Sequence, residues 1–404
     1  MSYNHDPSKS EIPPVKYPTK SYMPNTFIFL ILSTFIYSQN GVFPEQSFSI
    51  QESATFLPIN HSIKLSYDHT TLYKDGYAIY NVLTGRISRV IPSPDSDEVF
   101  VISVTVHKAK EPAILNFQAI SGMEETKPSW QIKVPYDMGF PDIVIHDDHV
   151  FFLWSGSQTY SVFTMNGKMV GQYSLFDESP WNMEKVILGM VHNDQLFFLG
   201  MQTARLNSRR NVTLFQLKPS FESNPLVSFD LVQPYFASFS QNNILAIVGS
   251  GSLSGSVDPV PYLTFYDLTG SENVITTPLG KMPRKIHWIN NQLTLAFKDR
   301  VTLYDPSDPE NPVSLSYGRE VYPLDYAEVE NSLLILAAKS VLPSPKTIKY
   351  GTISLMRLDL PKKTVSTYHV SSGSFNKVKL SHPDHSNAYF IQLDDIVNQY
   401  NLEQ

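Results

Sequence analysis

The 404-residue chain contains no cysteine. This absence excludes disulfide bonds, thiol catalysis, cysteine-ligated zinc and iron–sulfur clusters, and it excludes lipid attachment through an N-terminal cysteine. Hydrophobic residues make up 42% of the sequence. A chain of this length buries a large core without covalent cross-links. The protein is therefore expected to be held together by packing and hydrogen bonds alone.

Long apolar runs are also missing. The run Phe27–Tyr37 (FIFLILSTFIY) is much shorter than the ~20 residues that cross a bilayer, but it has the length of a signal-peptide core. Lys16 and Lys20 precede it, and Ser38 offers a cleavage point. We predict a disordered segment over 1–25, a signal peptide or short anchor over 26–40, and one domain over 41–404. Export to a secreted, periplasmic or envelope location follows. The alternatives are an uncleaved anchor, with membrane contact only through 27–37, or a buried strand in a cytoplasmic protein.

Charge of one sign is not in large excess, since the formal net charge is −7. The sequence lacks the basic balance of nucleic-acid-binding proteins, so no nucleic-acid partner is predicted. It also lacks any long apolar stripe with the 3.6-residue period of a helix. The 22 Tyr and 24 Phe favour strands, and the 29 Pro and 18 Gly suit many turns. These features together predict an all-β protein.

One sequence pattern recurs along the chain. It consists of a short run in which apolar residues alternate, a turn built on Asp or Asn, and a second apolar run. It reads IVIHDDHVFFL from Ile143 and MVHNDQLFFL from Met190. The turns of all seven copies are marked by Asp97, Asp148, Asp194, Asn243, Asn291, Asn331 and Ser386. Successive markers are separated by 40 to 55 residues. This period is typical of a β-propeller, in which each blade is a four-stranded sheet of ~40 to 50 residues.

The repeat predicts an all-β propeller of seven four-stranded blades. The Asp/Asn turn joins the first strand of each blade to the second, and an aromatic-rich third strand that ends in a polar turn follows, as in Tyr160–Gly167. After Ser386 the chain is long enough for only two more strands. The last blade must therefore take its outer strand from residues 46–90, which closes the ring and removes exposed edges. If residues 60–90 instead form a complete short blade, the count is eight.

One segment carries a family resemblance. Val301–Val313 (VTLYDPSDPENPV) has an apolar strand, an aspartate and a proline-containing turn. It resembles the LVIVD type of propeller repeat, which is similar to the YVTN and WD-repeat families. The other blades resemble the general pattern across residues 60–404, and no Gly-His…Trp-Asp pair is present. The resemblance implies a propeller and a binding role more often than a reaction.

Motifs of catalysis and cofactor binding are absent as well. The sequence has no Gly-x-Ser-x-Gly elbow, and its Gly/Ser stretch at 249–256 lacks the lysine of a phosphate-binding loop. The cluster His146-Asp147-Asp148-His149 offers metal-binding side chains. Sister repeats hold Asn and Asp at the same positions, however, and turn chemistry explains them. No catalytic residue, metal or cofactor is predicted.

The connections between second and third strands carry most of the remaining signal. They are long in several blades and contain eight basic residues but only two acids, Glu111 and Asp258. Such connections emerge on one face of a propeller, which would then bear a basic rim. The basic residues are Lys108, Lys110, Arg205, Arg209, Arg210, Lys339, Lys346 and Lys349. The competing interpretation is that variable surface loops simply carry soluble charged residues.

The preferred hypothesis is a monomeric, non-catalytic, exported platform that binds a protein or an anionic polymer, such as a glycan, through this rim. Its predicted binding residues are Lys108, Lys110, Arg205, Arg209, Arg210, Lys346 and Lys349. The alternative is a propeller hydrolase or lyase with its site at the mouth of the central channel. Asp142, Arg284 and Asp325 are its candidate residues, because they lie at or near the starts of first strands.

Overall fold

The computed structural model places Asn40–Gln404 in one compact unit. The structure describes residues 44–401 except 52–53, 59–63, 84, 93–97, 106–111, 122–123, 126–128, 135–140, 155–158, 176–182, 204–209, 230, 232, 252–259, 271–273, 318–320, 330, 344–347, 384–385 and 387. Within this part of the chain there is no helix long and apolar enough to cross a membrane. The predicted signal segment lies outside the described residues.

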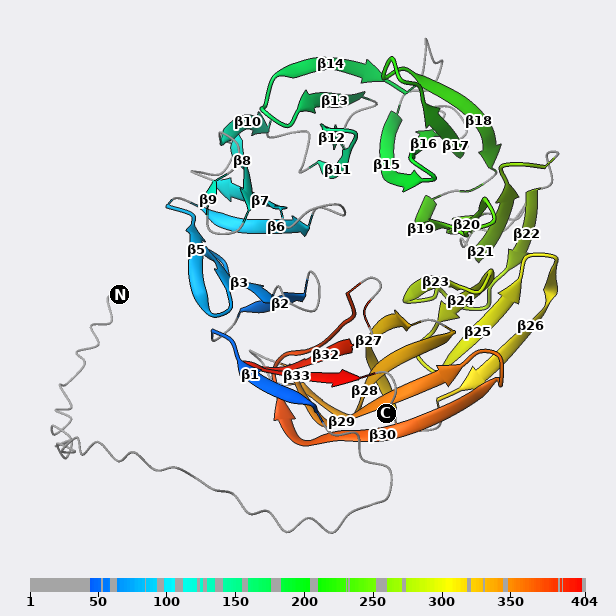
Figure 1. Ribbon diagram of the computed structural model, residues 1–404. Helices are drawn as coiled ribbons and strands as arrows, with labels where there is room; N and C mark the ends of the chain where they lie inside the picture. Colours follow the sequence, from blue (N-terminus) through cyan, green and yellow to red (C-terminus); the bar gives the residue numbers. More distant parts are fainter. Residues whose placement is uncertain are drawn as a thin grey trace, which may run out of the picture. The chain divides into compact units, whose positions relative to one another are not determined.

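The described chain forms eight antiparallel sheets arranged as the blades of a β-propeller (Figure 1). The first four blades, with their strands in chain order, are β2 (Thr55–Pro58), β3 (Lys64–Tyr67), β4 (Thr71–Lys74) and β5 (Tyr77–Asn81); β6 (Arg86–Pro92), β7 (Glu98–Thr105), β8 (Ala113–Ser121), β9 (Glu124–Glu125) and β10 (Trp130–Val134); β11 (Asp142–His146), β12 (His149–Leu153), β13 (Thr159–Thr164) and β14 (Met169–Ser174); and β15 (Met183–His192), β16 (Gln195–Thr203), β17 (Arg210–Leu217) and β18 (Ser223–Phe229).

The other four blades are β19 (Gln233–Phe239), β20 (Ile244–Gly251), β21 (Val260–Asp267) and β22 (Val274–Pro278); β23 (Lys285–Ile289), β24 (Gln292–Ala296), β25 (Arg300–Asp305) and β26 (Asp308–Ser316); β27 (Tyr322–Val329), β28 (Ser332–Pro343), β29 (Ile348–Asp359) and β30 (Thr364–Phe375); and β31 (Val378–Ser381), β32 (Ala388–Leu393) and β33 (Ile396–Asn401), completed by β1 (Gln46–Ser49). First strands of neighbouring blades contact one another, as β11 contacts β15 and β27 contacts β31.

The prediction of seven blades is wrong, and the alternative of eight is correct. The additional blade is β2–β5, which precedes the first marker in the sequence. Its strands have only four or five residues, and no adjacent Asp/Asn pair joins β2 to β3. The predicted closure agrees with the structure: β1 pairs with β33 in antiparallel register, with Gln46 opposite Gln399 and Ser49 opposite Ile396.

The Asp/Asn turns form as predicted between first and second strands. Both residues of the pairs Asp147-Asp148, Asn193-Asp194 and Asn290-Asn291 have positive φ, between 46° and 60°. Two-residue hairpins of type I′ require this conformation, and Asn and Asp adopt it more readily than other non-glycine residues. The marker residues therefore recur because of local backbone chemistry.

The core lies between blades. Second strands such as β24 and β32 are buried on both faces, so they appear in the sequence as continuous apolar runs. Leu263 and Phe265 of the fifth blade pack with Leu293 and Leu295 of the sixth. Turns between first and second strands and between third and fourth strands lie on one face of the ring, which we call the turn face. Connections between second and third strands and between blades lie on the other, which we call the loop face.

Candidate functional site

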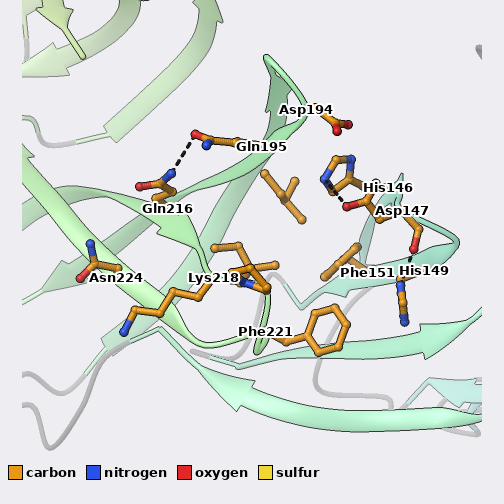
Figure 2. A pocket seen from close by; sticks show the side chains of 13 residues that line it. His146, Asp147, His149, Phe151, Asp194, Gln195, Gln216, Lys218, Phe221 and Asn224 are labelled. Atoms are coloured by element: carbon orange, nitrogen blue, oxygen red, sulfur yellow. Dashed lines mark hydrogen bonds and ion pairs between the residues drawn. The ribbon is translucent and has the colours of Figure 1, made fainter. Parts of the chain in front are cut away.

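A cleft of about 500 Å³ lies on the turn face, where the third blade meets the fourth (Figure 2). One wall is the β11–β12 turn of the third blade. The other is formed by the β15–β16 turn and the β17–β18 turn of the fourth blade. Acidic and imidazole groups gather at one end, whereas Lys218 and Asn224 lie at the other. The cleft is lined by His146, Asp147, His149, Phe151, Asp194, Gln195, Leu196, Gln216, Leu217, Lys218, Pro219, Phe221 and Asn224.

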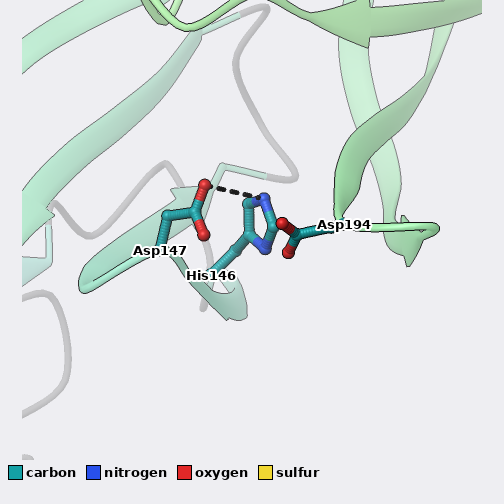
Figure 3. A group of neighbouring side chains, drawn as sticks. All are labelled: His146, Asp147 and Asp194. Carbon is teal, nitrogen blue, oxygen red and sulfur yellow. Dashed lines mark ion pairs between the residues drawn. The ribbon is translucent and has the colours of Figure 1, made fainter.

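The acidic end joins two turns that are distant in the sequence (Figure 3). Ligand atoms of His146, Asp147 and Asp194 all lie within 4.8 Å of one another. His146 Nε2 is 3.4 Å from Asp147 Oδ2, and the imidazole is largely buried whereas the Asp147 side chain is 71% exposed. The type I′ turns fix both aspartates on rigid hairpins. Two carboxylates are thus held close together at a water-accessible edge.

Two equivalent junctions elsewhere in the ring are closed by neutral amides. Between the fourth and fifth blades, Asn193 Nδ2 donates to Asn243 Oδ1 at 2.7 Å. Between the sixth and seventh, Asn290 Nδ2 donates to Asn331 Oδ1 at 2.5 Å. The junction between the third and fourth blades has Asp147 and Asp194 instead. It therefore concentrates negative charge where the sister junctions form amide hydrogen bonds.

The floor of the cleft is apolar and is completed by Phe221. The Phe221 ring lies 4.8 Å from the His149 ring and 6.1 Å from the Phe151 ring, measured between centroids. The Tyr160 hydroxyl donates a hydrogen bond to the Phe221 carbonyl and so anchors the β17–β18 turn to the third blade. Phe221 has a φ of 64°, which is unfavourable for a bulky side chain.

The acidic end has donors that a divalent cation accepts: one imidazole nitrogen and two carboxylate oxygens. These are fewer than the four ligands of a structural zinc site. Of the four residues of the His146–His149 sequence cluster, only His146 and Asp147 belong to this group. The third member is Asp194, which comes from the next blade. The prediction that no metal binds stays a prediction.

On the loop face, a second surface covers the sixth and seventh blades. Lys281 Nζ and Arg300 Nη1 each lie 3.2 Å from a carboxylate oxygen of Asp299. Lys298 Nζ lies 6.0 Å from the centre of the Tyr322 ring. Arg284 Nη1 donates to the Pro323 carbonyl at 2.9 Å. These contacts place the residues side by side at the loop end of the two blades.

The seventh blade extends this surface through its β28–β29 hairpin, whose strands have 12 residues each. Leu342 is 59% exposed and Ile348 is 50% exposed near the tip. Lys339 and Lys349 are exposed on the same hairpin. We define the loop surface as Lys281, Arg284, Lys298, Asp299, Arg300, Tyr322, Lys339, Leu342, Ile348 and Lys349. It contains six basic residues and one carboxylate among its ten described members.

Most of the predicted rim lies outside the described residues. Lys349 is described and belongs to the loop surface, and Lys339 and Lys349 lie in strands instead of in a loop. Arg210 begins β17, but its side chain is not described. The remaining predicted residues, Lys108, Lys110, Arg205, Arg209 and Lys346, lie outside the described residues. Their segments do connect second to third strands, as expected.

The candidates for a channel-mouth enzyme form junctions between blades. Asp142 Oδ1 lies 3.0 Å from Arg89 Nη1, which joins the third blade to the second. Asp325 Oδ1 lies 2.9 Å from Lys285 Nζ, and its Oδ2 accepts the Leu380 N–H at 3.0 Å. The structure brings Arg284 and Asp325 to the junction of the sixth and seventh blades, and it places Asp142 at a different junction. Each of these contacts has a structural explanation.

No family model matches the chain, and no curated protein matches it. Solved structures do match. Hsv2 from Kluyvelomyces marxianus is 6% identical with a TM-score of 0.44, over 77% of this chain and 90% of that one. The WD40 domain of Toxoplasma gondii coronin is 11% identical with a TM-score of 0.44, over 89% of this chain and 87% of that one. Both TM-scores are low, and the assignment of the β-propeller fold rests on the eight sheets of this chain.

Proposed function

We propose that the protein is a non-catalytic binding platform that recognises an anionic partner, a protein or a glycan, through the loop surface. The observation that carries this proposal is the charge of that surface. It has six basic residues and one carboxylate, whereas the whole chain has a net charge of −7. A basic area on an acidic protein attracts anionic molecules and orients them during approach.

The apolar tip of the β28–β29 hairpin supports the same conclusion. Leu342 and Ile348 have large hydrophobic side chains, and at least half of each side chain remains exposed. They stand beside Lys339 and Lys349. Apolar side chains surrounded by charges that a partner can neutralise are typical of interfaces. The hairpin therefore provides buried area on binding, and the lysines provide long-range attraction.

The segments Lys108–Lys110 and Arg205–Arg210 would add basic residues to the same face, because they connect second to third strands in the second and fourth blades. We further propose that the platform is exported, on the sequence of Phe27–Tyr37. Mass spectrometry of the mature N-terminus in fractionated cells tests export. A chain recovered from the cytoplasm with residues 1–38 intact would contradict it.

The experiment for the binding function is affinity capture from the source cells, read by mass spectrometry. One bait is the unaltered chain. A second bait, the loop-surface variant, carries Lys298→Glu, Lys339→Glu and Lys349→Glu. The matched control carries Lys168→Glu, Lys362→Glu and Lys363→Glu, which make the same charge change on exposed residues of the turn face. A variant with Arg205→Glu, Arg209→Glu and Arg210→Glu tests the rest of the rim.

The expected result is a partner that the unaltered chain and the turn-face control capture and that the loop-surface variant loses. Capture should also weaken as salt concentration rises, because exposed charges are screened within ~10 Å at 0.1 M. If the turn-face control loses the partner equally, overall charge and not the loop surface determines binding. Capture that is the same for every variant would refute the proposal.

A further inference from the structure

We propose that the cleft between the third and fourth blades is a second binding site, which accepts an arginine or lysine side chain flanked by an apolar residue on a peptide segment of a partner. This site lies on the turn face and is independent of the loop surface. It needs a cavity, a complementary charge and an apolar wall. The structure provides each of these from different residues.

The charge comes from Asp147 and Asp194. One carboxylate oxygen of each aspartate and one ring nitrogen of His146 all lie within 4.8 Å of one another. Two like charges at this distance repel each other, so a cation between them is stabilised. A guanidinium presents several N–H donors in one plane and can hydrogen-bond both carboxylates at once. The amide-closed junctions at Asn243 and Asn331 lack this acceptor set.

The apolar wall is Phe221 with Phe151 and neighbouring leucines. The structure holds Phe221 in the left-handed region, which costs about 1–2 kcal/mol for a residue with a side chain. The corresponding β13–β14 turn of the third blade has the same hydrogen bonds but uses Gly167, with φ 77°. The Phe221 ring packs against His149 and Phe151 of the third blade, so it provides a fixed apolar wall that a glycine at this position would not supply.

The dimensions of the cleft fit a short peptide segment. Its volume of about 500 Å³ exceeds that of one side chain, and its far end carries Lys218 and Asn224. Asn224 and Gln195 have amide groups of the kind that hydrogen-bond a peptide backbone. A basic side chain at the acidic end would thus place its apolar neighbour over Phe221.

The test is selection from a random peptide library displayed on phage, with the full chain as target, followed by fluorescence anisotropy of the enriched peptides. The test variant carries Asp147→Asn and Asp194→Asn. The matched control is Asp148→Asn, which removes one charge from the same turn at a residue that does not line the cleft. Asn favours the positive φ of all three positions, so these variants should fold normally.

We expect enriched peptides to contain Arg or Lys beside an apolar residue. The double variant should weaken their binding roughly tenfold or more, because charge-assisted hydrogen bonds are lost. Asp148→Asn should leave it unchanged, and Phe221→Gly should weaken it while thermal unfolding shows an intact fold. Failure to enrich such peptides, or binding that the double variant does not weaken, would overturn the proposal. Binding that disappears with a chelator would overturn it too, in favour of a metal ion at the two carboxylates.

Discussion

Asp325 should contribute strongly to the stability of the ring, because its carboxylate joins the seventh blade to the blades on both sides. Its carboxylate accepts hydrogen bonds from Lys285 of the sixth blade and from the Leu380 N–H of the eighth. The Asp325 side chain is 18% exposed and that of Lys285 is 45% exposed. Asp325→Ala removes an ion pair and leaves a buried backbone N–H without its acceptor.

The two losses have different sizes. A partly exposed ion pair contributes about 0.2–1 kcal/mol, whereas an unsatisfied buried donor costs about 1–3 kcal/mol. We therefore expect Asp325→Ala to lower the free energy of unfolding by about 1–4 kcal/mol, and the Tm by about 1–5 °C in a domain of this size. Thermal unfolding followed by circular dichroism and urea titration measures both quantities.

Asp142→Ala is the matched control. Like Asp325, Asp142 accepts the N–H of its own next residue and pairs with a basic residue of the preceding blade, Arg89. Within the described part of the chain, no hydrogen bond or ion pair joins its side chain to the following blade. Its replacement should cost less than about 1 kcal/mol, and salt should reduce that cost further. Equal destabilisation by the two variants, or complete suppression of the Asp325 effect by salt, would show that the Leu380 N–H contact is unimportant.

Two further predictions concern a turn and a buried tyrosine. Gly167→Ala should lower the free energy of unfolding in urea titration by about 2 kcal/mol or more, because φ is 77° and a Cβ would lie 2.4 Å from the Trp130 ring. Gly280→Ala is the control and should be neutral, because a Cβ there would have no atom within 4 Å. Burial raises the pKa of Tyr400 from 10.0 to about 12, so its contribution to stability is present below pH 10 and is lost as pH rises through 12. Tyr400→Phe keeps the ring stack on Tyr389 and should make the alkaline decline of unfolding free energy shallower by up to about 3 kcal/mol; an unchanged pH profile would contradict this account.

The architecture could be predicted from the sequence because it depends on local chemistry. Pairs such as Asn290-Asn291 adopt positive φ whatever lies around them, so they mark hairpins wherever they occur. The blade count failed for the same reason. The hairpin between β2 and β3 lacks an adjacent Asp/Asn pair and gave no marker.

The binding cleft could not be predicted, because no continuous segment contains it. Asp147 and Asp194 belong to two turns of the same repeat and look equivalent in the sequence. Only the packing of neighbouring blades brings their carboxylates together. The sequence gives a weak signal of the backbone strain at Phe221. The turn Lys218-Pro219-Ser220-Phe221 has an aromatic residue where the Gly167 turn has glycine. That signal is visible once the two turns are aligned.

The pairing of β1 with β33 has a consequence for biosynthesis. Some 347 residues separate Ser49 from its partner Ile396. At 5–20 residues per second, β1 leaves the ribosome roughly 17–70 s before that partner does. During this interval the ring is open, because the eighth blade is incomplete and β1 has no partner strand; unpaired strand edges favour pairing between different chains. Pairing of β33 with β1 completes the ring, so a chain that terminates before β33 leaves an open and aggregation-prone product.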